Sequence, residues 1–170
     1  DLAAFPDTAS PGPTGWRPHD AWASRATRVS LRTGVTLLAM TGQPEDDRFP
    51  LGCGVALFNC ALFHESHEAL ETLRRRSGGG LQQGLQGLIL LACGYYHQQC
   101  HHAAGMRSMW MDAAQHLRSF KGELETPWGR IEFSKSMAMA AERLEWLEKF
   151  SAEDDWARFW ETPSPEWEFA

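Results

Sequence analysis

The chain has 170 residues, of which 43% are hydrophobic and 22% charged, and its formal net charge is −6 at pH 7. This size and composition fit one globular domain with a substantial core. The negative charge argues against nucleic-acid binding, because the only basic cluster is the short run Arg74–Arg76, and the longest apolar run, Gly87–Tyr96, is too short to span a membrane.

The first part of the chain divides into an arm and a helix. Residues 1–20 contain four prolines and two glycines, a composition that predicts an extended N-terminal arm. The chain opens at Asp1 rather than at a methionine, and no positively charged start followed by an apolar run indicates a secretory signal. Apolar residues at loose helical spacing then predict a first helix over Ala21–Met40, with Gly42 as its C-terminal cap.

Three helices are predicted in the middle of the chain. Leu51–Asn59 and Leu62–Arg75 are short, and the glycine run Gly78–Gly80 ends the second of them. Leu81–Cys100 is apolar nearly all the way round, which is typical of a buried central helix. Its inner glycines predict that another element packs closely against it, because each costs about 0.5–1 kcal/mol relative to alanine. We expect the inaccessible core of this helix to include Leu88, Leu91 and Ala92.

The remaining segments predict further helices and no strand. Apolar residues spaced by three or four mark one helix from Met106 to Phe120 and another from Phe133 to Phe150, with a turn at Thr126–Gly129 between them. The predicted fold class is therefore all-α, a compact single domain of about five to seven helices around a buried central helix. We assign residues 1–20 to the arm, 21–162 to the helical domain and 163–170 to a C-terminal aromatic tail.

Aromatic side chains gather near the C-terminus, and free aromatics of this kind promote association. We expect them to pack back on the body of the domain or to form the contact of a homo-oligomer. The residues concerned are Trp156, Phe159, Trp160 and Trp167.

The four cysteines show no C-x-x-C spacing. We interpret them as small core residues in a reducing, cytoplasmic environment. Zinc binding through cysteine and histidine is the alternative. The residues are Cys53, Cys60, Cys93 and Cys100.

Ionisable residues cluster between positions 64 and 71. On a helix that turns about 100° per residue, four of them share one side, and Glu65 lies at its margin. Their side chains are of the types used for metal ligation or proton transfer. A solvated helix face is the simpler interpretation. The four are His64, His67, Glu68 and Glu71.

Two stretches resemble a known family. The letters FN at 58–59 and HEALE at 67–71, followed by LQGLI at 85–89 and YH at 96–97, are similar to two motifs of the domain of unknown function 309 family, over roughly Gly52–Leu117. The resemblance implies a small helical protein and no particular activity. It implies a polar cluster of Glu65, His67, Glu68, Glu71, Gln86 and His97. The chain departs from the motifs at Ala61 in place of glycine, His64 in place of an aromatic residue, Leu90 in place of glutamine and Arg74 in place of tryptophan.

Gln86 and His97 are eleven residues apart, close to three helical turns, and therefore share one stripe of the central helix. We predict that His97 faces the His67, Glu68 and Glu71 side of the preceding helix, because buried polar groups need partners. Three arrangements could neutralise the carboxylates there. A divalent cation could bind them, protonated histidines could pair with them in a structural network, or one carboxyl could keep its proton as a catalytic acid.

These alternatives give two hypotheses of function. The first is a small metal-dependent or acid/base enzyme of hydrolase type, and the second is a non-catalytic helical interaction module held by a polar network. The candidate catalytic residues are His67, Glu68 and His97. The candidate binding residues are Glu65, Gln86 and Tyr96. The candidate ligands of a divalent metal are His64, His67, Glu68, Glu71 and His97.

A second group of histidines follows the central helix. His101 and His102 come directly after Cys100. They indicate either a solvated helix end or an accessory set of metal ligands.

Overall fold

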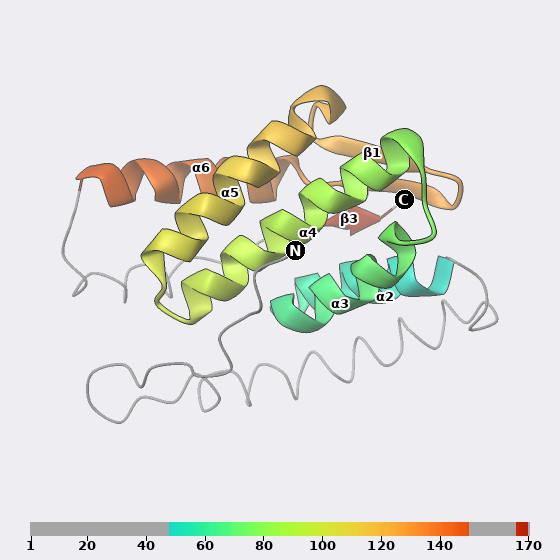
Figure 1. Cartoon of the computed structure of the whole chain (residues 1–170), viewed down its shortest axis with the longest axis horizontal. Helices are drawn as coiled ribbons and strands as arrows, with labels where there is room; N and C mark the ends of the chain where they lie inside the picture. Colours follow the sequence, from blue (N-terminus) through green and yellow to red (C-terminus); the bar gives the residue numbers. More distant parts are fainter. Residues whose placement is uncertain (1–47, 150–165, 170) are drawn as a thin grey trace.

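The computed structural model describes residues 48–149 and 166–169, and within them it has five α-helices and a small antiparallel sheet (Figure 1). The all-α fold class is therefore confirmed, with the sheet as an addition. The predicted helix Ala21–Met40 and the aromatic residues Trp156, Phe159 and Trp160 lie outside the described residues. The helices are α2 (Arg48–Asn59), α3 (Phe63–Arg74), α4 (Gly79–Gln99), α5 (Ala103–Leu117) and α6 (Ser134–Lys149), with a short 3₁₀ helix at Arg118–Phe120. The strands are β1 (Glu123–Thr126), β2 (Gly129–Glu132) and β3 (Glu168–Phe169).

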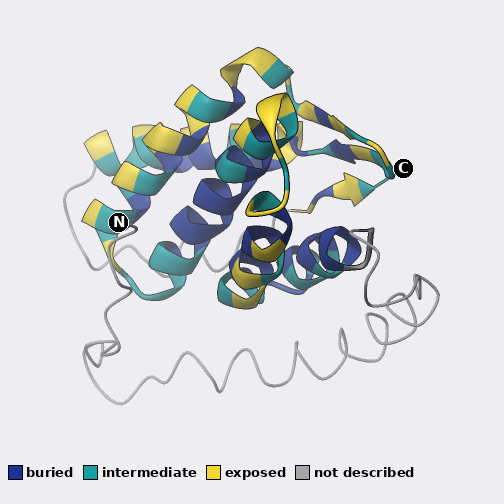
Figure 2. Cartoon of the chain, turned by 45° about the vertical axis from the view of Figure 1, so that its right-hand side comes forward, coloured by how far each residue is buried: buried dark blue, intermediate teal, exposed yellow. Residues whose placement is uncertain are grey.

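Helix α4 is the centre of the domain, and it packs against α3 on one side and α5 on the other (Figure 1). Its middle turns are buried, as Figure 2 shows. The predicted core residues Leu88, Leu91 and Ala92 are all 0% exposed, which confirms the prediction for this helix. Burying a leucine side chain contributes about 1.5–3 kcal/mol, so α4 contributes much of the core.

Three inner glycines of α4, Gly84, Gly87 and Gly94, mark places where neighbours approach closely, as predicted, whereas Gly80 near the start of the helix does not. A Cβ on Gly94 would overlap the indole of Trp110 in α5. A Cβ on Gly87 would lie 2.5 Å from two side-chain carbons of Leu117, at the other end of α5. Trp110 is 1% exposed, and its indole N–H donates a hydrogen bond of 3.2 Å to the carbonyl of Leu91. Glycine at these positions thus lets α4 and α5 pack at short range.

The turn predicted at Thr126–Gly129 joins two strands that the sequence analysis did not predict. Strands β1 and β2 pair in antiparallel register from Glu123 opposite Glu132 to Thr126 opposite Gly129. The Thr126 hydroxyl donates to the Gly129 carbonyl at 2.6 Å and accepts from the Trp128 amide at 3.2 Å. Each strand has only four residues and buries one side chain, Leu124 or Ile131, which is too short a pattern to be told from a loop.

The C-terminal residues that the structure describes return to the body of the domain. Strand β3 pairs with β2, with Phe169 opposite Ile131. Trp167 is 2% exposed and stacks on Phe58 of α2, with ring centroids 3.7 Å apart. The side chain of Asn59 makes two hydrogen bonds to the backbone of the same residue. Its Nδ2 donates to the Trp167 carbonyl at 2.8 Å, and its Oδ1 accepts from the Trp167 backbone N–H at 2.7 Å. The prediction that Trp167 packs back on the domain is therefore confirmed.

Among the described residues, no helix is both long enough and apolar enough to cross a membrane.

Candidate functional site

Helix α3 carries most of the predicted site, and its position is fixed by contacts with α2. The backbone reverses between the helices at Ala61, whose φ of 59° lies in the left-handed region. Only glycine adopts this conformation without a steric cost, which gives a physical reason for the glycine that the family motif has here. Ser66, buried at 0% exposure, donates a hydrogen bond of 2.7 Å to the carbonyl of Gly54. No pattern in the sequence indicates this bond.

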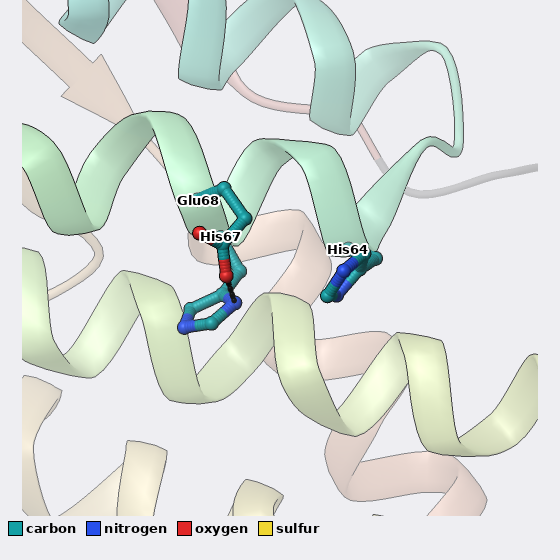
Figure 3. A group of neighbouring side chains, drawn as sticks. All are labelled: His64, His67 and Glu68. Atoms are coloured by element: carbon teal, nitrogen blue, oxygen red, sulfur yellow. Dashed lines mark ion pairs between the residues drawn. The ribbon is translucent and has the colours of Figure 1, made fainter. Parts of the chain in front are cut away.

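Three of the predicted residues come together on α3. One ligand atom from each of His64, His67 and Glu68 can be chosen so that all lie within 4.8 Å of one another. Figure 3 shows both imidazoles on the side of α3 that faces the next helix, with the Glu68 carboxylate beside His67. The Nδ1 atom of His67 is 3.3 Å from Oε1 of Glu68. We call these three residues the α3 cluster.

The members of the α3 cluster differ in burial. The His67 side chain is 6% exposed, whereas that of Glu68 is 64% exposed, and His64 is half-buried. Burial is the main cause that lowers the pKa of His67 from its ordinary value of 6.5, and the nearby Glu68 opposes the shift only in part. The imidazole of His67 is therefore neutral at pH 7, which is the form that binds metal ions.

Glu71 was a predicted metal ligand, but in the structure its carboxylate is paired with two arginines. The guanidinium of Arg74 donates to both Glu71 oxygens at 2.7 Å, and Arg75 adds a bond of 3.1 Å. The hydrogen bonds from Arg74 are the main cause that lowers the pKa of Glu71. Glu71 is thus a paired, buried anion outside the α3 cluster. The three- and four-residue spacing of acid and base on one helix was the signal for this pairing.

His97 does not lie where the sequence analysis predicted. Its Nδ1 is 3.1 Å from Nδ1 of His102, and a Cβ on Gly105 of α5 would come within 2.6 Å of it. Tyr96 of α4 contacts the α3 cluster, with its ring centroid 5.4 Å from that of His64. The reason is the 100° turn per residue. Tyr96 faces α3, and His97 is turned toward α5.

The other predicted residues lie outside the α3 cluster. Gln86 lines a cavity of about 330 Å³ between α4 and α5, together with His116 of α5 and four further residues. Glu65 is exposed to solvent. Gln86 therefore faces α5, as His97 does.

Cys93 is a buried thiol of α4. Burial, together with the neighbouring carboxylates Glu68 and Glu71, raises its pKa to about 12. The thiol is therefore protonated at pH 7, whereas a metal ligand must be the thiolate.

The comparison with known families agrees with the motifs. Residues 51–109 match the model of the family described as domain of unknown function (DUF309). The matched segment runs from α2 to the middle of α5 and includes the α3 cluster. No curated protein and no solved structure gives a significant match.

Proposed function

We propose that this protein, whose residues 51–109 match the DUF309 family model, is a metal-dependent enzyme of hydrolase type, with the α3 cluster as its metal site. The observation that carries this proposal is the convergence of three ligand atoms within 4.8 Å. They come from His64, His67 and Glu68, which follow one another at spacings of three and one along a single helix. The α3 cluster is thus set by the geometry of one rigid element.

The composition of the α3 cluster favours a particular class of ion. Two imidazoles and one carboxylate suit zinc and similar transition metals rather than calcium or magnesium. Three protein ligands leave a coordination position for water, and a bound divalent ion would lower the pKa of that water or polarise a carbonyl or phosphoryl group. His67 is already neutral and buried, so binding would require little proton release from it.

A second function is supported by a different observation. Glu71, Arg74 and Arg75 form a closed network in which both carboxylate oxygens accept hydrogen bonds. A helical interaction module would use such a network, with the α3 cluster extending it, to hold α3 in register. In that case the α3 cluster would be structural, and its removal would change stability without changing metal content.

Zinc binding by matched variants tests the first proposal. We expect His67→Ala to abolish one zinc site in calorimetric titrations of the full chain, while the control His116→Ala on α5 keeps it. We also expect ester or phosphoester hydrolysis by the zinc-loaded protein to be lost in His67→Ala and after chelation. Equal zinc binding by wild type and His67→Ala would overturn the metal site. Equal destabilisation by His67→Ala with and without chelator would support the interaction module.

A further inference from the structure

The turn between α4 and α5 brings two histidines together. After Cys100 ends α4, His101 takes a left-handed conformation with φ of 55°. The amide of His102 then donates to the carbonyl of His97 at 2.9 Å. This backbone bond places the two imidazoles against each other, with ring centroids 5.0 Å apart.

We propose that Nδ1 of His97 and Nδ1 of His102 form a second site for a divalent transition-metal ion, separate from the α3 cluster. The two nitrogens are 3.1 Å apart. Metal–imidazole bonds are about 2.0–2.1 Å long, so neighbouring nitrogen ligands of a square-planar or tetrahedral ion lie about 2.9–3.4 Å from each other. The observed separation therefore suits two ligands of one ion without rearrangement of the turn.

Gly105 supplies the space in which these nitrogens converge. A Cβ at this position would lie 2.6 Å from Nδ1 of His97 and 2.7 Å from Nδ1 of His102. Both distances are shorter than a normal contact between non-bonded atoms. Glycine in the first turn of α5 thus leaves room for both rings, and any larger residue would push at least one ring away.

Without a metal ion, the contact between the two rings is a hydrogen bond. It requires one Nδ1 to carry a proton and the other to offer a lone pair. A metal ion accepts both lone pairs and leaves both protons on Nε2. His102 is exposed and His97 half-buried, so the remaining coordination positions are open to water. Imidazole ligands favour copper, nickel and zinc.

Zinc titration monitored by ¹⁵N NMR of the histidine side chains tests this second site. We expect the Nδ1 signals of His97 and His102 to shift together along one saturation curve. His102→Ala should weaken zinc binding at the turn about tenfold or more, equivalent to at least 1.4 kcal/mol. Its exposed position means that the fold should persist. Gly105→Ala should give a similar loss by displacing a ring.

Two controls separate this site from the α3 cluster. His116→Ala, on the same helix α5, should leave the shifts at the turn unchanged. His67→Ala should also leave them unchanged, even if the α3 cluster binds no metal, so the two proposals fail independently. The second site is overturned if zinc leaves the His97 and His102 signals in place, or if His102→Ala binds zinc at the turn as tightly as wild type.

Discussion

Glu71 is a motif residue whose main partner, Arg74, departs from the motif. Its side chain is 6% exposed and accepts two bonds from Arg74, which stands where the family motif has tryptophan. Removing Arg74 would leave a buried carboxylate with Arg75 alone. We expect Arg74→Ala to lower the free energy of unfolding at pH 7 by about 1–3 kcal/mol, measured by urea denaturation. Arg75, 73% exposed, is the matched control, and Arg75→Ala should cost less than about 1 kcal/mol.

The contribution of the Glu71 pairing should depend on pH. Its arginine partners lower the pKa of Glu71 from 4.5, so the folded state holds the charged form more firmly than the unfolded chain does. The stabilisation is therefore present above pH 4.5 and is lost as the pH falls through the folded-state pKa. A cost of Arg74→Ala that stayed constant through this acid range would contradict the assignment.

His67 should make the protein sensitive to pH in a higher range. Burial lowers its pKa from 6.5, so between the folded-state pKa and 6.5 the unfolded chain binds a proton that the folded chain does not. The free energy of unfolding should therefore fall as the pH drops below 6.5. His67→Gln should make the free energy of unfolding depend less steeply on pH. Some dependence should remain, because burial also lowers the pKa values of His97 and His101. An unchanged slope in His67→Gln would contradict the prediction.

The residues of the site could be named from sequence more reliably than their partners. Helical periodicity correctly grouped His64, His67 and Glu68 on one side of α3, because residue spacing fixes their relative direction. It could not show that Arg74 pairs with Glu71, since ion pairing and metal ligation compete for the same carboxylate. Nor could it show that α4 presents Tyr96 to α3 and His97 to α5, because this depends on how the helix is rotated within the core.

The short distance between α4 and α5 depends on glycine. A Cβ on Gly94 would overlap the Trp110 ring, whereas a Cβ on Gly80, near the start of α4, would meet nothing within 4 Å. We expect Gly94→Ala to destabilise by about 1–3 kcal/mol through overpacking. Gly80→Ala should be neutral or stabilise by up to about 1 kcal/mol, because alanine favours the helix. Thermal unfolding of both variants measures the contrast, and equal effects would show that close packing is not the cause.

The C-terminal segment is joined to α2 by Asn59 and Phe58. Two hydrogen bonds connect the Asn59 side chain to the Trp167 backbone, each worth about 0.5–1.5 kcal/mol. We expect Asn59→Ala to lower the free energy of unfolding by about 1–3 kcal/mol and to speed amide exchange at Trp167. Truncation after Phe150 should also destabilise the protein. Because the truncated chain lacks Trp167, Asn59→Ala should have a much smaller effect there than in the full chain. Full additivity would contradict it.

Helices could be predicted from the sequence where the apolar pattern extended over several turns. Helices α4 and α6 repeat apolar residues over several turns, so their periodicity identifies them. Strands β1 and β2 each offer one buried side chain, Leu124 or Ile131. Strand β3 has two residues and forms by pairing with β2, more than thirty positions earlier. Such strands depend on distant contacts that local sequence does not record.

The arrangement around α4 implies a single cooperative unit among the described residues. Helices α3 and α5 and strand β1 all contact α4, and the α4 residues Leu88, Leu91 and Ala92 are fully buried. The amides of these residues should therefore exchange with solvent only when the domain unfolds globally. Their exchange free energy should equal the free energy of unfolding from urea denaturation. Amides near Lys149, at the end of α6, should exchange faster through local fraying.

The destabilised variants sharpen this last prediction. If α4 exchanges only by global unfolding, Gly94→Ala and Arg74→Ala should lower its exchange free energy by the same amount as they lower global stability, although the two residues lie on different helices. Local opening near Lys149 should not change, because it does not break the contacts of α4. Amide exchange measured on wild type and both variants makes the comparison. If the amides of α4 exchanged faster than those of α6, or if both substitutions left the exchange free energy of α4 unchanged, α4 would not be the centre of the fold.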